Sequence, residues 1–166
     1  MEWLPELVSC DGNWVEIVER LYPIFKSDFV DTRATLDGLQ VALRIAPARE
    51  NKEFDFWHFI TEGETEENRK PDLERCRRLR WFRAILDNAA DQRLKRWEQK
   101  RNGRTTVAIG SPDFSYIVFL SKRIGADGTP YFLTLTAYYV LRPKKREQYR
   151  KEHEEYVKSS QKPTPP

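Results

Sequence analysis

The sequence predicts an α+β fold, with an N-terminal helical region and further helices packed on a small antiparallel sheet that includes a C-terminal three-stranded meander. Three observations support this prediction. Apolar residues recur at spacings of three and four in the first half of the chain, as in amphipathic helices. Short alternating segments, separated by glycine and proline turns, follow in residues 104–140. The chain has 166 residues, of which 13% are aromatic, so one domain with one core is expected over residues 1–160.

Residues 1–53 form an acidic helix and strand region. Asn13 is a suitable N-cap for a helix within residues 2–30, and Pro23 is expected to end that helix. Residues 39–45 then alternate apolar and polar side chains, which is the pattern of a half-buried strand.

Residues 54–158 are expected to form the core of the fold, beginning with the aromatic segment 54–61 as an extended segment or a tightly packed turn. Asp72 is a plausible N-cap for an amphipathic helix that continues to Ala89 and carries arginines on its polar face. A second, short helix is predicted for residues 91–100, with Leu94 and Trp97 as its buried pair and Gly103 breaking it.

The meander follows, with strands predicted at residues 104–109, 114–121 and 131–140. A charged surface helix is expected over residues 143–158, and a disordered tail over residues 161–166.

Charge is segregated along the chain. Residues 1–68 contain 6 Lys and Arg against 15 Asp and Glu, whereas residues 69–104 contain 13 against 5. Residues 105–166 contain 10 against 6, and the whole chain has a net charge of +3. A basic segment of this kind indicates an anionic ligand such as RNA. The alternative is that acidic and basic segments neutralise each other across the fold.

Several classes of protein are not supported by the sequence. It has no apolar run of about 18 residues and no N-terminal signal pattern, so no membrane association and a cytoplasmic location are expected. Its two thiols, Cys10 and Cys76, suit a reducing compartment, although a disulfide between them remains open. No glycine-rich phosphate loop and no Cys/His metal set is present, so neither a cofactor nor a metal is expected.

The last strand of the meander separates into two predicted faces. One face is apolar and suited to packing on helices: Tyr131, Leu133, Leu135, Ala137 and Tyr139. The other consists of Phe132, Thr134, Thr136 and Tyr138, and its two threonines and tyrosine form a row of hydroxyl groups that suits phosphate oxygens. The alternative reading is that Thr and Tyr are simply good strand formers on a solvated face.

The order of these elements resembles the phage-associated members of the barnase–EndoU–colicin–RelE-like nuclease superfamily. The resemblance covers roughly residues 54–156. It is carried by Phe56-Trp57-His58, by Arg69-Lys70-Pro71-Asp72 with Arg75, Arg78 and Trp81, by Trp97 with Arg101 and Arg104, and by Tyr116–Leu120 and Leu135–Tyr138.

The resemblance implies metal-independent cleavage of RNA. A base removes the proton of the ribose 2′-OH, the oxygen attacks phosphorus, and an acid protonates the departing 5′-oxygen. The candidate catalytic residues are His58, Arg104, Thr136 and Tyr138. The candidate RNA-binding residues are Arg75, Arg78, Arg101 and Thr134. The general base cannot be assigned, and a cognate inhibitor protein would be a further partner.

His58 is the main candidate for proton transfer because an unperturbed imidazole has a pKa near 6.5. The alternative is a structural histidine in an aromatic cluster, since Trp57 and Phe59 flank it. Two other functions also remain open. One is a non-catalytic nucleic-acid-binding module on the same basic face, and the other is a protein-interaction adaptor that uses the acidic first third of the chain.

Overall fold

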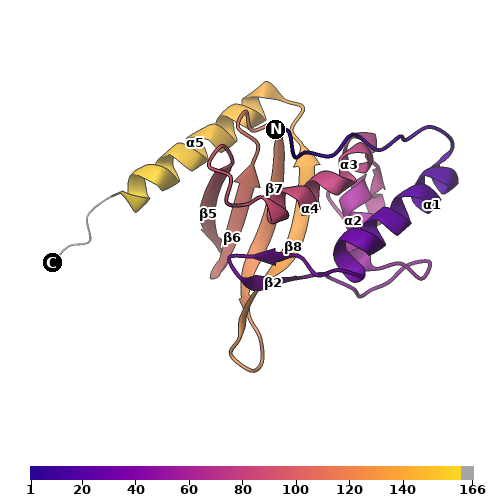
Figure 1. Cartoon of the computed structure of the whole chain (residues 1–166), viewed down its shortest axis with the longest axis horizontal. Helices are drawn as coiled ribbons and strands as arrows, with labels where there is room; N and C mark the ends of the chain where they lie inside the picture. Colours follow the sequence, from indigo (N-terminus) through magenta and orange to yellow (C-terminus); the bar gives the residue numbers. More distant parts are fainter. Residues whose placement is uncertain (162–166) are drawn as a thin grey trace.

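In the computed structural model, which describes residues 1–161, helices pack on both faces of a six-stranded sheet (Figure 1). The α+β prediction is confirmed. The helical elements are α1 (Trp14–Phe25), η1 (Lys26–Val30), α2 (Phe54–Ile60), η2 (Glu66–Asn68), α3 (Leu73–Arg77), α4 (Leu79–Asp87) and α5 (Pro143–Ser160). The strands are β1 (Thr35–Leu36), β2 (Leu39–Ala42), β3 (Thr61–Glu62), β4 (Lys70–Pro71), β5 (Lys95–Arg101), β6 (Arg104–Gly110), β7 (Tyr116–Ile124) and β8 (Pro130–Tyr139).

The main sheet has the strand order β1-β2-β8-β7-β6-β5, and β3 pairs with β4 in a separate small sheet. The meander of β6, β7 and β8 lies where the sequence predicts it. The sheet is mixed rather than antiparallel, because β2 runs parallel to β8 with Val41 opposite Phe132. A parallel neighbour requires a long crossover connection, and here α2, α3 and α4 lie in the chain between the two strands.

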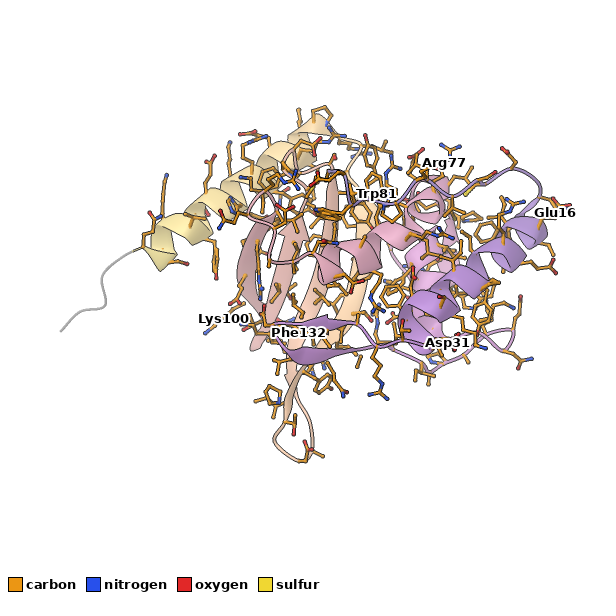
Figure 2. All side chains as sticks on the ribbon, in the orientation of Figure 1. Glu16, Asp31, Arg77, Trp81, Lys100 and Phe132 are labelled. Atoms are coloured by element: carbon orange, nitrogen blue, oxygen red, sulfur yellow. The ribbon has the colours of Figure 1, made fainter. Side chains whose placement is uncertain are left out.

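Alternate side chains of the central strands enter two separate apolar clusters, one on each face of the sheet. Val107 and Ile109 belong to the large cluster beneath α1, α2, α3 and α4. Ala108, which lies between them, belongs to a smaller cluster with Trp97 and with Tyr149 from α5. Figure 2 shows the side chains, including Trp81 of α4 and Phe132 of β8. Helix α5 therefore lies on the face opposite the other helices.

The prediction of an extended segment or a tightly packed turn at residues 54–61 is wrong, because residues 54–60 form helix α2. Phe56, Phe59 and Ile60 are all buried, and their spacing of three and four places them on one helical side. The ring of Phe25 lies 5.4 Å from that of Phe56 and 5.8 Å from that of Phe59. Packing against α1 therefore overrides the strand preference of the aromatic residues.

The predicted helix at residues 91–100 is also wrong, because this segment forms β5. The strand pairs with β6 over its whole length, from Lys95 opposite Gly110 to Arg101 opposite Arg104. Asn102 and Gly103 connect the two strands with φ values of 51° and 74°, as a two-residue hairpin turn requires. Leu94 and Trp97 are buried as predicted.

Two predicted helix boundaries also differ from the structure. Asn13 caps α1 as expected, but Pro23 lies inside the helix, which continues into the η1 turn. The buried side chains of Phe25 and Phe29 explain why the chain stays helical beyond the proline. Asp72 caps α3, but the predicted long helix divides at Arg78 into α3 and α4.

The two faces predicted for the last strand change places partway along β8. Phe119 pairs with Thr136, whereas the next residue, Leu120, pairs with Thr134, so Leu135 is an extra residue in the ladder. Such a bulge reverses the alternation of side chains beyond it. Thr134 is therefore buried on the side of α2, while Thr136 is half-buried on the side of α5.

Candidate nucleic-acid interface

A groove of about 470 Å³ lies between α5 and the exposed part of the sheet face that α5 covers. We call it the α5 groove. Strands β5, β6, β7 and β8 form its floor, and α5 forms its side. Its lining residues are Gln99, Arg101, Thr106, Phe119, Leu135, Thr136, Tyr138, Lys145, Gln148, Tyr149 and Glu152.

Aromatic rings make up the apolar part of the α5 groove. The rings of Phe119 and Tyr138 are stacked, with centroids 5.7 Å apart and planes 21° apart. Tyr149 of α5 packs against Phe119 at 5.8 Å, and its hydroxyl is hydrogen-bonded to that of Tyr138. The bulge at Leu135 is what turns Tyr138 toward this side of the sheet.

Arg75 reaches the groove from α3, at the part of the β8 edge that β2 does not cover. Its Nη1 donates to Thr136 Oγ1 at 3.1 Å and to the main-chain oxygen of His58 at 3.3 Å. Its guanidinium carbon lies 5.3 Å from the ring centroid of Tyr138. Asp72 holds the other end of the group, accepting from Nε at 3.2 Å. Arg75 is thus fixed beside the groove.

Two further cations line the α5 groove. Arg101 lies on β5, and Lys145 lies on the first turn of α5 with its ammonium group 4.9 Å from the ring centroid of Tyr149. One carboxylate, that of Glu152, also lines the groove and accepts from Gln148 Nε2 at 3.0 Å. The groove lining therefore has two positive groups and one negative group, and the Arg75–Asp72 ion pair lies beside it.

Both tyrosine hydroxyls of the groove are protonated at neutral pH. Burial raises the pKa of Tyr138 above its usual value. Burial, together with the hydrogen bond to Tyr138, also raises the pKa of Tyr149. Because the two hydroxyls are hydrogen-bonded to each other, one of their two protons is used between them and the other is left to donate to an anionic oxygen.

His58 does not line the α5 groove, although its main-chain oxygen binds Arg75. Its ring stacks on Phe54 at 5.5 Å, and its Nδ1 lies 3.6 Å from Glu66 Oε1 without a hydrogen bond. Burial and the nearby guanidinium groups, Arg69 first, lower the pKa of His58 to about 3. The imidazole is therefore neutral near pH 7, and it lies outside the α5 groove.

The remaining predicted residues divide between the groove and other places. Thr136, Tyr138, Arg75 and Arg101 come together at the groove. The other three do not: Thr134 is fully buried and bonded to the Asp55 carboxylate, Arg78 is buried and paired with Glu74, and Arg104 lines a different hollow. The bulge in β8 explains why Thr134 is buried on the other face of the sheet. The break between α3 and α4 at Arg78 explains why the Arg78 side chain does not point the same way as that of Arg75.

Part of the basic segment is neutralised by the acidic first third of the chain. Arg93 pairs with Glu2 at 2.9 Å, and Arg96 pairs with Asp37 at 2.6 Å. These pairs support the neutralisation alternative for those arginines. At the groove, Arg75 pairs instead with Asp72, which lies outside residues 1–68, so the acidic first third neutralises only part of the basic segment.

Sequence reasoning missed the contribution of α5. Lys145, Gln148, Tyr149 and Glu152 all line the groove, although the helix is highly charged and was expected to lie on the surface. Tyr149 is only 6% exposed. The sequence signal that pointed to it is the pair of aromatic residues, Tyr149 and Tyr156, in an otherwise polar helix.

Comparisons with protein-family models, with curated proteins and with solved structures found no match to this chain. Within residues 1–161, no helix is both long and apolar enough to cross a membrane. The same residues contain no group of three or more His, Cys, Asp or Glu side chains arranged to hold a metal ion. Cys10 and Cys76 are both free thiols.

Proposed function

We propose that the protein binds single-stranded RNA in the α5 groove. The observation that carries this proposal is the gathering of Arg75, Arg101 and Lys145 around the stacked rings of Phe119 and Tyr138. Proteins that bind single strands combine cationic groups along the backbone with aromatic rings on which bases stack. The groove supplies both kinds of contact.

The chemistry of the groove favours an unpaired strand over a duplex. Bases in a duplex are covered by their neighbours, whereas unpaired bases can be turned out and stacked on aromatic rings. The groove volume of about 470 Å³ also falls within the usual range for enclosed ligands of roughly 300–1,000 Å³. Polar side chains such as Thr136 and Gln99 lie beside the rings and suit contacts with ribose hydroxyl groups.

The direct test is fluorescence anisotropy with a labelled single-stranded RNA and the Arg101→Ala variant. A charge-assisted hydrogen bond contributes about 1.5–3 kcal/mol, so we expect the variant to bind about tenfold more weakly or worse. The slope of log K against log salt should also become shallower by about 0.7, because one phosphate contact is lost.

The matched control is Lys26→Ala, which removes one positive charge from η1, away from the groove. We expect its affinity to equal that of the unaltered protein. Equal losses in Arg101→Ala and Lys26→Ala would mean that binding follows net charge and not the groove. A protein that does not bind RNA even at low salt would disprove the proposed function.

Metal-independent cleavage of the bound RNA is a second candidate, favoured by the carboxylate of Glu152 in the same groove as Tyr138 and Arg101. Glu152 would take the proton from a ribose 2′-OH, whose oxygen attacks phosphorus. Tyr138 would protonate the departing 5′-oxygen as the P–O bond breaks, leaving a cyclic phosphate. Arg101 and Arg75 would stabilise the charge on the phosphorane.

Incubation of labelled RNA with the protein in EDTA tests this second candidate. We expect Glu152→Gln to abolish cleavage and to keep RNA binding, while His58→Ala keeps both. Cleavage that survives in Glu152→Gln would rule out this carboxylate as the base. If RNA stays intact with the unaltered protein, cleavage is disproved and RNA binding stays the proposed function.

A further inference from the structure

A second hollow, of about 730 Å³, lies at the end of the sheet where the β1–β2, β5–β6 and β7–β8 hairpins come together. Its lining includes Arg104, Thr105, Lys122, Arg123, Ile124 and Tyr131. Figure 1 shows that the loop joining β7 to β8 extends beyond the rest of the sheet at this end. In Figure 2, Lys100 of β5 and Phe132 of β8 mark the same end.

Two of the three cations in this hollow are available to a ligand. Lys122 is paired with Glu98 at 2.6 Å. Arg123 uses Nε to bond Ser121 Oγ at 2.9 Å, which leaves its two terminal nitrogens to donate elsewhere. Arg104 is exposed, and its side chain makes no hydrogen bond or ion pair with any residue from 1 to 161. The carboxylate at the rim, Asp37, is already bonded to Arg96.

The second hollow adjoins the α5 groove at the β5–β6 hairpin. Arg101, which lines the groove, pairs directly across the hairpin with Arg104, which lines the second hollow. Arg104 also shares a face of β6 with Thr106 of the groove, because residues two apart on a strand point the same way and lie about 7 Å apart. The cross-strand pair of Arg101 and Arg104 therefore links the two hollows.

We propose that the second hollow is a further subsite for the same RNA strand, which leaves the α5 groove over the end of the β5–β6 hairpin. This inference rests on the proposed RNA binding. Arg104 and Arg123 contact successive phosphates there, and the half-buried ring of Tyr131 offers a surface on which a base stacks. A strand confined to the α5 groove does not reach these residues, whereas a longer strand does.

The test compares two labelled RNAs of about 4 and about 12 nucleotides, the range covered by single binding modules of this kind. Anisotropy titrations use the full-length chain and the Arg104→Ala/Arg123→Ala double variant. The unaltered protein should bind the longer RNA at least tenfold more tightly than the shorter one. The double variant should lose most of that difference and keep the affinity for the short RNA. Its salt slope for the long RNA should fall by about 1.4, or about 0.7 for each phosphate contact.

The charge-matched control is Lys26→Ala/Lys70→Ala, whose residues line neither hollow. It should keep the full difference between the two RNAs. A double variant Arg104→Ala/Arg123→Ala that also keeps the difference would overturn the second subsite, as would equal affinities of the two RNAs for the unaltered protein. Both results would leave groove binding of the short RNA intact, whereas failure to bind either RNA would overturn the proposed function itself.

Discussion

Thr134 and Thr136 are two residues apart on β8, yet the bulge between them predicts different effects for the same substitution. At Thr134 we expect mainly a loss of stability, and at Thr136 mainly a loss of binding. Thr134 is fully buried, and its hydroxyl bonds the buried Asp55 carboxylate and lies 3.2 Å from the Ala42 main-chain oxygen. Thr136 is half-buried in the α5 groove. Valine has nearly the same shape as threonine, so Thr→Val removes a hydroxyl without a large change in volume.

Thr134→Val leaves a buried carboxylate without one of its hydrogen-bond partners. The cost of such a loss is about 1–3 kcal/mol, which corresponds to a decrease in Tm of about 2–4 °C per kcal/mol for a chain of this size. Thr136→Val removes the acceptor of one hydrogen bond from Arg75, but Arg75 keeps Asp72 and the His58 main-chain oxygen as partners. We therefore expect a smaller loss of stability than for Thr134→Val, about 0.5–1 kcal/mol. The lost hydroxyl also removes a hydrogen bond from the groove, worth about 0.5–1.5 kcal/mol, and so should weaken RNA binding about 2- to 10-fold.

Urea unfolding followed by tryptophan fluorescence measures the stability, and anisotropy measures the binding. The two variants serve as controls for each other. A Thr134→Val protein that unfolds at the same urea concentration as the unaltered chain would refute the reasoning. A Thr136→Val protein that is the less stable of the two would also refute it, because the bulge would then not separate the two faces.

Four further predictions concern other parts of the molecule. Because the pKa of His58 is lowered to about 3, its NMR signals should stay those of a neutral ring from pH 8 to pH 5, and an inflection near pH 6.5 would contradict this. The unfolded chain binds that proton below about pH 6.5, so His58 should make the fold less stable as pH falls from there toward 3. Arg44→Met should lower the free energy of unfolding in urea by about 3 kcal/mol, at the low end for a broken buried pair, because Arg44 is 26% exposed while Asp55 is fully buried. A smaller loss of stability in the double variant Arg44→Met/Asp55→Leu would show that the unpaired Asp55 charge is the cause. Trp97→Ala should cost about 3–5 kcal/mol, since Trp97 is 1% exposed between β5 and α5, and a Tm close to that of the unaltered chain would count against this packing. Burial raises the pKa of the Cys76 thiol, so Ellman's reagent should modify it only after unfolding; rapid reaction of two thiols in the folded protein would oppose this.

Local patterns in the sequence predicted the meander and most caps. Asn13 and Asp72 cap their helices through side-chain contacts within three residues, so nearby residues suffice to predict them. The strands of the meander are bounded by turn residues, and β6 pairs with β7 without a register shift. These features depend on neighbours in the chain.

Two of the errors lie where distant residues decide the structure. Segment 54–60 is helical because Phe56 and Phe59 pack on Phe25, thirty or more residues earlier. The bulge in β8 exists only in the pairing with β7. The third error is different, because segment 95–101 pairs with the adjacent strand β6, and the Asn102-Gly103 turn between them is a local signal of a hairpin.

The candidate site was predicted only in part. Arg75, Arg101, Thr136 and Tyr138, four of the eight residues implied by the family resemblance, lie together at the α5 groove. His58 was chosen for its usual pKa, but nearby arginines and burial change that value. Glu152 could not be placed, because nothing in a charged helix shows which residues will meet the sheet.

Helix α5 is attached less firmly than the sheet it covers. Of its 18 residues, Tyr149 is the one that is fully buried, whereas β7 contributes Ile117, Val118 and Leu120 at 0% exposure. Elements with little buried apolar surface open at a lower free energy than the rest of a protein. The α5 groove thus has the sheet as its firmly packed wall and α5 as its weakly attached wall, so an outward movement of α5 would widen the groove without disturbing the large apolar cluster on the other face of the sheet.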